Sequence, residues 1–61
     1  MNELRKGKEV IYLLDKKYID AILTDIEFDS RGNEVYTIKY TLNDIIFTKK
    51  ITDRSEIIAK I

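Results

Sequence analysis

Apolar and polar residues alternate along most of this chain, in short runs that are separated by turn residues. Alternation with a period of two is typical of β-strands, because successive side chains of a strand point to opposite faces. The pattern predicts four clear strands and a short final one. Their expected ranges are residues 9–14, 18–29, 34–42, 45–52 and 57–61.

The longest run, from Tyr18 to Phe28, changes phase in its middle. Apolar residues mark one face up to Leu23 and have the opposite parity from Ile26 onward. Because side chains alternate strictly, this switch requires one extra residue, a β-bulge near Thr24-Asp25. Such a bulge lets one strand serve two sheets of a small barrel. Five apolar residues of the run are then expected in the core despite their conflicting parity: Ile19, Ala21, Leu23, Ile26 and Phe28.

Three polar segments predict the turns between the first four strands. In Ser30-Arg31-Gly32-Asn33, the glycine can adopt a positive φ, as a type I turn with a G1 bulge requires. Asp15-Lys16-Lys17 and Asn43-Asp44 are expected to form shorter turns.

The C-terminal segment begins with Asp53 and Glu56 at capping-box spacing, which predicts a single 3₁₀ or α turn. A short strand is expected to follow it. A C-terminal helix is the alternative, because Ile57, Ile58 and Ile61 also suit one helical face.

Five short strands with a bulged second strand and a helical turn before the last one predict an all-β, SH3-like small barrel. The barrel would span residues 9–61, after a polar arm of residues 1–8. In its first two thirds the chain resembles Tudor-type barrels, through Tyr18, Ala21-Ile22-Leu23 and Ile38-Lys39-Tyr40. The same stretch also resembles the Sm-like barrel, whose second strand is long and bent.

The Tudor-type resemblance implies an aromatic rim that holds methylated lysine or arginine, since ring faces stabilise a cation. The rim residues it implies are Tyr12, Tyr18 and Tyr40, with Tyr36 on the core face. Packing of these rings in the core is the alternative interpretation.

The composition argues against catalysis and against bound groups. The 61 residues include no Cys and no His, which excludes disulfides and a structural zinc site. The two serines, Ser30 and Ser55, have no plausible base beside them. We therefore expect no enzyme, no catalytic or metal-ligating residues, and no cofactor.

Charge gives two further hypotheses, although the net charge is zero. Asp25, Glu27 and Asp29 share one strand face, and they form either a hard-cation site or a solvated face neutralised by Lys39 and Arg31. Lysine and arginine residues form either a phosphate-binding patch or a protection of strand edges. These residues are Arg5, Lys6, Lys8, Lys16, Lys17, Lys49 and Lys50.

An excess of aliphatic side chains points to association. Eleven of the 61 residues are Ile, and several apolar positions have the parity opposite to the expected core. Contiguous exposed aliphatic side chains usually mark an interface. The expected interface residues are Ile11, Leu13, Ile22, Ile46 and Ile58.

The sequence therefore predicts a non-enzymatic protein–protein interaction module that forms a homo-oligomer, such as a bacterial or phage accessory, inhibitor or assembly protein. The alternative is an Sm-like or Tudor-like barrel that binds single-stranded nucleic acid or RNA. No stretch approaches the roughly 20 apolar residues of a membrane span, so a cytoplasmic location and no membrane partner are expected.

Overall fold

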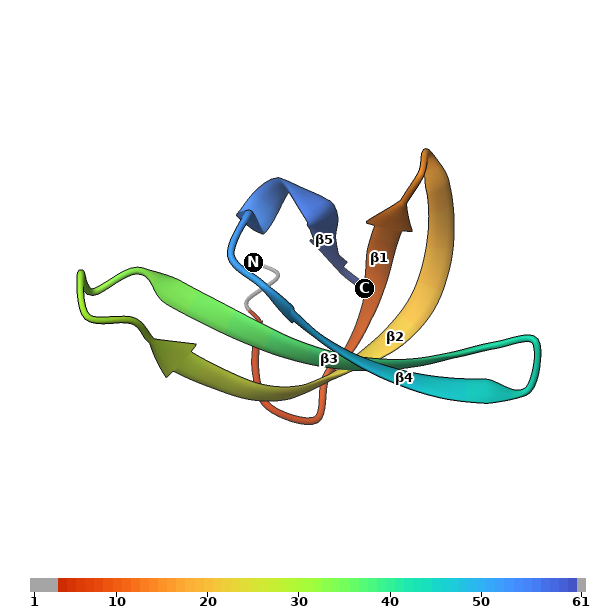
Figure 1. Cartoon of the computed structure of the whole chain (residues 1–61), viewed down its shortest axis with the longest axis horizontal. Helices are drawn as coiled ribbons and strands as arrows, with labels where there is room; N and C mark the ends of the chain where they lie inside the picture. The colour runs from red at the N-terminus through yellow and green to blue at the C-terminus, as the bar shows by residue number, and fades with distance from the viewer. Residues whose placement is uncertain (1–3, 61) are drawn as a thin grey trace.

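The computed structural model describes residues 4–60, which form five antiparallel strands in one sheet (Figure 1). The strands follow the order β4-β3-β2-β1-β5 across the sheet, and a 3₁₀ helix (Arg54–Glu56) precedes the last strand. The prediction of an all-β fold is confirmed. The strands are β1 (Glu9–Leu14), β2 (Lys17–Phe28), β3 (Glu34–Leu42), β4 (Ile45–Ile51) and β5 (Ile57–Ala59).

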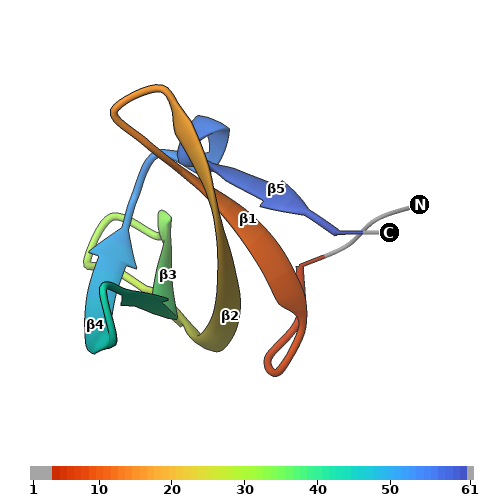
Figure 2. The same cartoon turned by 90° about the vertical axis from the view of Figure 1, so that its right-hand side faces the viewer.

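The predicted bulge is present in β2. Leu23 lies opposite Ile38 and Asp25 lies opposite Thr37, so Thr24 is the extra residue. The Thr24 hydroxyl donates a hydrogen bond to the Thr37 carbonyl oxygen at 3.1 Å. The long second strand bends and crosses the molecule (Figure 2), which brings β1 and β3 around a common concave side. The phase break in the sequence therefore marks the bend of the sheet.

The sheet curls but does not close, so the predicted closed barrel is wrong in this respect. Within residues 4–60, β4 and β5 form the two edges of the sheet and no strand pairing joins them. β5 is only three residues long, and all three pair with Val10–Tyr12 of β1. β4 therefore keeps a free edge.

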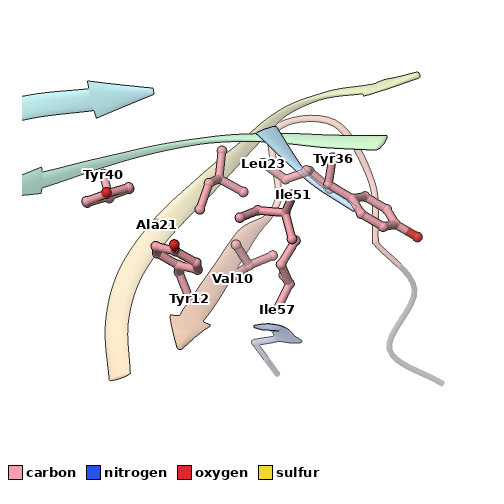
Figure 3. Packing of buried hydrophobic residues seen from close by; sticks show 9 residues of the cluster. Val10, Tyr12, Ala21, Leu23, Tyr36, Tyr40, Ile51 and Ile57 are labelled. Carbon is pink, nitrogen blue, oxygen red and sulfur yellow. The ribbon is translucent and has the colours of Figure 1, made fainter. Parts of the chain in front are cut away.

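The core fills the concave side of the sheet (Figure 3). Leu4, Leu14, Ile19 and Ile26 pack against it and are half-buried. Phe28 was expected in the core, but its side chain is 69% exposed. It lies opposite Glu34 at the end of the β2–β3 hairpin, beyond the reach of the other strands. The buried cluster is Val10, Tyr12, Ala21, Leu23, Tyr36, Ile38, Tyr40, Ile51 and Ile57.

The turns follow the predicted positions. Asp15 and Lys16 both have positive φ, 48° and 66°, and so do Asn43 and Asp44, 52° and 63°. Two consecutive positive φ values define type I′ turns, whose twist matches that of the strands. In the β2–β3 turn Gly32 has φ 83°, and its N–H donates to the Asp29 carbonyl oxygen at 3.0 Å.

The C-terminal segment forms the predicted helical turn and strand, and the alternative of a C-terminal helix is wrong. The Asp53 carboxylate caps the 3₁₀ helix by accepting from the Ser55 N–H at 3.0 Å and from its hydroxyl at 2.7 Å. The Glu56 N–H donates to the Asp53 carbonyl oxygen at 3.1 Å. The strand then covers Ile57–Ala59, whereas the expected end at residue 61 lies outside the described residues.

Residues 4–8, the described part of the N-terminal segment, form a turn that is attached to β2 beside the bulge. The Lys8 N–H donates to the Arg5 carbonyl oxygen at 3.0 Å. The Gly7 N–H donates to the Leu23 carbonyl oxygen at 2.7 Å, and the Leu23 N–H donates to the Lys8 carbonyl oxygen at 2.9 Å. Leu23 therefore joins the N-terminal turn to the core.

Two apolar residues of β2 should respond differently to truncation. Leu23→Ala removes a fully buried side chain and should cost about 2–5 kcal/mol of unfolding free energy. Phe28→Ala removes an exposed ring and should change that free energy by less than about 0.5 kcal/mol. Urea unfolding monitored by circular dichroism measures both. Equal losses of unfolding free energy in the two variants would mean that the core residues are wrongly assigned.

The turn geometry predicts opposite effects at two positions. Gly32→Ala meets no neighbouring atom, so its cost of about 1 kcal/mol should come from the positive φ alone. Lys16→Gly relieves a positive φ at a residue with a side chain and should stabilise by about 0.5 kcal/mol. Thermal melts compare the two variants with the parent chain. A stabilising Gly32→Ala would refute the turn assignment.

Candidate functional site

The three tyrosines of the expected aromatic rim do not come together. Tyr12 and Tyr40 lie inside the core cluster, with ring centroids 5.3 Å apart. Tyr18 is 70% exposed and lies opposite Leu13, the neighbour of Tyr12 in β1. Because consecutive strand residues face opposite sides, Tyr18 is on the outer face of the sheet. The three tyrosines therefore lie on two different faces of the sheet. Tyr12 and Tyr40 pack in the core, as in the alternative interpretation.

A cation of the chain itself already covers the inner aromatic pair. The Lys49 ammonium lies 5.4 Å from the centroid of the Tyr12 ring, and Phe47 stacks on Tyr40 with centroids 5.4 Å apart. Polar contact with Tyr12 raises the pKa of Lys49 above its ordinary value. The Tyr12 hydroxyl is buried without a partner in hydrogen-bond geometry, so this contact is electrostatic proximity. The ring face that a bound cation would need is thus occupied.

Asp25 and Glu27, two of the acids within β2, have partners other than the expected Lys39 and Arg31. Lys6 lies 3.5 Å from Asp25, and Lys50 lies 3.5 Å from Glu27. The Asp29 carboxylate accepts hydrogen bonds from backbone N–H groups of its own turn. Among residues 4–60 no three acidic side chains gather as a metal site would require. The acids are distributed over a neutralised surface.

Acidic side chains lie beside several of the lysines. Lys6 and Lys50 face the acids of β2, and the Lys60 ammonium lies 3.0 Å from a carboxylate oxygen of Asp20. Hydrogen bonding to Asp20 raises the pKa of Lys60. A phosphate-binding surface would need lysines that converge without acids between them. Lys6, Lys50 and Lys60 do not offer that arrangement.

The expected interface residues lie on the outer face of the sheet, but in two separate places. Ile11 lies directly opposite Ile58, and Ile22 lies opposite Glu9, one diagonal step from Ile11. Asp20, which bridges to Lys60, lies opposite Ile11 and interrupts the surface. We define the outer patch as Ile11, Leu13, Tyr18, Ile22 and Ile58.

Ile46 does not belong to the outer patch. It lies on β4 opposite Thr41, and two strands separate β4 from β1. At the usual strand spacing this puts Ile46 about 14 Å from Ile11. The five expected interface residues therefore do not converge, because the open sheet spreads its outer face.

Ile46 instead belongs to a second apolar surface, which the alternation of the sequence did not indicate. The end of the β3–β4 hairpin projects beyond β1 and β5 (Figure 1) and exposes large apolar side chains on both of its faces. Ile45 is 57% exposed and Ile46 is 62% exposed. We call this surface the apolar tip. It consists of Leu42, Ile45, Ile46 and Phe47.

A signal for the apolar tip was present in the sequence. Ile45, Ile46 and Phe47 are three consecutive apolar residues directly after the Asn43-Asp44 turn. A strand that is apolar on both faces needs cover on both faces. Next to a two-residue turn this chain has no element that can supply such cover.

A polar hollow of about 560 Å³ lies at the other end of the sheet. Arg54 lines it and donates a hydrogen bond to the Ile57 carbonyl oxygen at 2.6 Å. Burial and a hydrogen bond with Glu34 raise the pKa of Tyr36. Because the charged groups of the hollow are engaged within the chain, it offers no evident ligand chemistry. Its lining comprises Asp29, Asn33, Glu34, Tyr36, Thr52 and Arg54.

Comparisons with protein-family models, with curated proteins and with solved structures return no match. Within residues 4–60, no helix is long and apolar enough to cross a membrane. The assignment of a functional surface therefore rests on the chain's own residues.

The turn that bears Asp29 predicts a pH dependence of stability. Hydrogen bonds from the backbone N–H of Asn33, and then of Arg31, lower the pKa of Asp29. A lowered pKa means that the carboxylate stabilises the fold above about pH 4, the unfolded value, and that this is lost as pH falls through the folded value.

Asp29→Asn isolates this effect from that of Asp53, whose pKa is also lowered by hydrogen bonds from Ser55. Thermal melts of both proteins should differ by a constant amount above about pH 5, and the difference should shrink below pH 4. A difference independent of pH down to pH 2 would contradict the role of the carboxylate.

Proposed function

We propose that this chain is a non-enzymatic protein–protein interaction module that associates with itself through the apolar tip. The exposure of Leu42, Ile45, Ile46 and Phe47 at the end of one hairpin carries this proposal. Contiguous exposed aliphatic and aromatic side chains are costly in water and usually mark an interface.

The size of the chain supports association as well. A domain of 61 residues buries only about 60% of its unfolded surface, and its stability is correspondingly small. Six of the seven residues of β4 are exposed, and only Ile51 reaches the core. Cover over this strand by a partner would bury apolar surface that the single chain leaves in water, and would stabilise the fold by mass action.

The architecture is best understood as an SH3-like small barrel that remains open between its two edge strands, β4 and β5. The bulged second strand and the 3₁₀ turn before the last strand support this relationship. A cytoplasmic accessory, inhibitor or assembly role in a bacterium or phage fits a small module without catalytic residues. Binding of single-stranded nucleic acid has less support, because acids are interspersed with the lysines.

A charge placed in the apolar tip should abolish self-association. Ile46→Glu would bury an unpaired carboxylate in the interface, which should weaken association by more than about 30-fold. Sedimentation velocity over a concentration series measures the association, and circular dichroism checks the fold. Ser30→Glu, an equal change of charge at the opposite turn, is the matched control and should associate like the parent chain.

Four outcomes would count against the proposal. A parent chain that stays monomeric up to millimolar concentration would refute self-association. Unchanged association of Ile46→Glu would exclude the apolar tip, and loss of association in Ile22→Glu alone would move the interface to the outer patch. Steep weakening of association by salt would favour the charged surfaces, since an apolar contact depends little on ionic strength.

A further inference from the structure

We infer that the partner at the apolar tip is a second copy of this chain, and that the two β4 strands pair antiparallel about a two-fold axis at Phe47. The two sheets would then join edge to edge into one continuous sheet. This inference rests on the proposed self-association and adds its geometry.

The free edge of β4 is the first reason. Within residues 4–60, β4 pairs with β3 on one side only, along all of Ile45–Ile51. An edge strand presents unpaired backbone N–H and C=O groups, which a second strand can satisfy. The other edge strand, β5, is only three residues long. β4 is thus the long edge that strand addition can use, and its first residues belong to the apolar tip.

Symmetry restricts how two β4 strands can pair. A two-fold axis perpendicular to the sheet keeps the equivalent faces of both copies on the same side. Residues that lie opposite each other therefore have the same parity, so the axis passes between one residue and its own copy. The exposed part of β4 runs from Ile45 to Lys50, and a centre at Ile45 would pair no other residue of the strand, so the candidate centres are Ile46, Phe47, Thr48, Lys49 and Lys50. A centre at Lys49 or Lys50 would place like charges opposite each other, which destabilises a strand pair.

Charge complementarity selects one of the remaining centres. With the axis at Phe47, residues 45–49 of the two β4 strands pair with each other. Lys50, which lies 3.5 Å from Glu27 of its own chain, then comes next to Asp44, the turn residue directly before β4 of the second copy, and the symmetric pair repeats this contact. With the axis at Ile46, Lys50 lies opposite Leu42, and with the axis at Thr48 it lies opposite Ile46. Among these centres only Phe47 brings a carboxylate next to a lysine where the paired strands end, and neighbouring opposite charges stabilise a strand pair.

The same register continues the packing of the concave face. Phe47 stacks on Tyr40, which contacts Tyr12, so an aromatic row crosses the sheet toward β4. At the two-fold axis each Phe47 ring would meet its copy, because residues directly opposite each other have Cβ atoms about 5 Å apart. Ile45 would lie opposite Lys49, whose aliphatic stem can cover it. The outer face would pair Ile46 with Thr48.

Reversal of the two charges tests this register. Lys50→Asp places two carboxylates next to each other at both ends of the paired region, besides removing the ion pair with Glu27, and should weaken dimerisation about tenfold or more. Asp44→Lys should have a similar effect by opposing two lysines. The double variant restores an opposite-charge pair and should recover dimerisation to near the parent value. The turn tolerates lysine at this position, because Lys16 has the same place and a similar φ in the β1–β2 turn.

Amide hydrogen exchange provides the second measurement. Half of the β4 amides already bond to β3, and the alternate amides should become protected only at concentrations where the parent chain dimerises. Sedimentation gives the dissociation constants of all four proteins, and circular dichroism confirms their fold.

The outcomes separate this inference from the proposed function. If the parent chain dimerises and Ile46→Glu disrupts the dimer, but the double variant does not recover and the β4 amides stay unprotected, the strand pairing is wrong while self-association stands. If the parent chain is monomeric throughout, both fail. Recovery of the double variant together with new β4 protection supports the pairing.

Discussion

An antiparallel sheet has two edges unless it closes on itself, and this constraint decides most of what the chain presents to its surroundings. Closure here would require β4 and β5 to pair with each other. β5 pairs with β1 over three residues and β4 pairs only with β3, so the sheet stays open between these two edges. The free backbone edge and the exposed apolar side chains of the apolar tip coincide on the same hairpin.

The bulge at Thr24 determines how far the core extends. It lets β2 bend, so that residues of both parities along one strand contribute to the concave side. Leu23, directly before the bulge, is hydrogen-bonded to the N-terminal turn and packs in the core cluster. The ends of the β2–β3 and β3–β4 hairpins extend beyond the core, one on each side of the molecule. Phe28 and Ile45 are exposed because they lie at these two ends.

Much of the backbone could be predicted from the sequence, because local rules determine it. The parity change located the bulge, Gly32 located a turn, and Asp53 located the 3₁₀ helix. Closure could not be predicted, because it depends on whether the edges of β4 and β5 meet in space, and the alternation of residues along single strands does not show this. The same holds for the site: parity assigned Ile46 to the outer face, but only the extent of the hairpin shows that Phe47, on the inner face, is also exposed.

The central claim, that one copy of β4 pairs with another, is tested most directly by nuclear Overhauser effects between isotope-labelled and unlabelled copies in a mixed dimer. Pairing about Phe47 predicts intermolecular contacts from Phe47 to its own copy and from Ile45 to Lys49. Intermolecular contacts that arise only from the outer patch around Ile11 and Ile58, with none from β4, would contradict it.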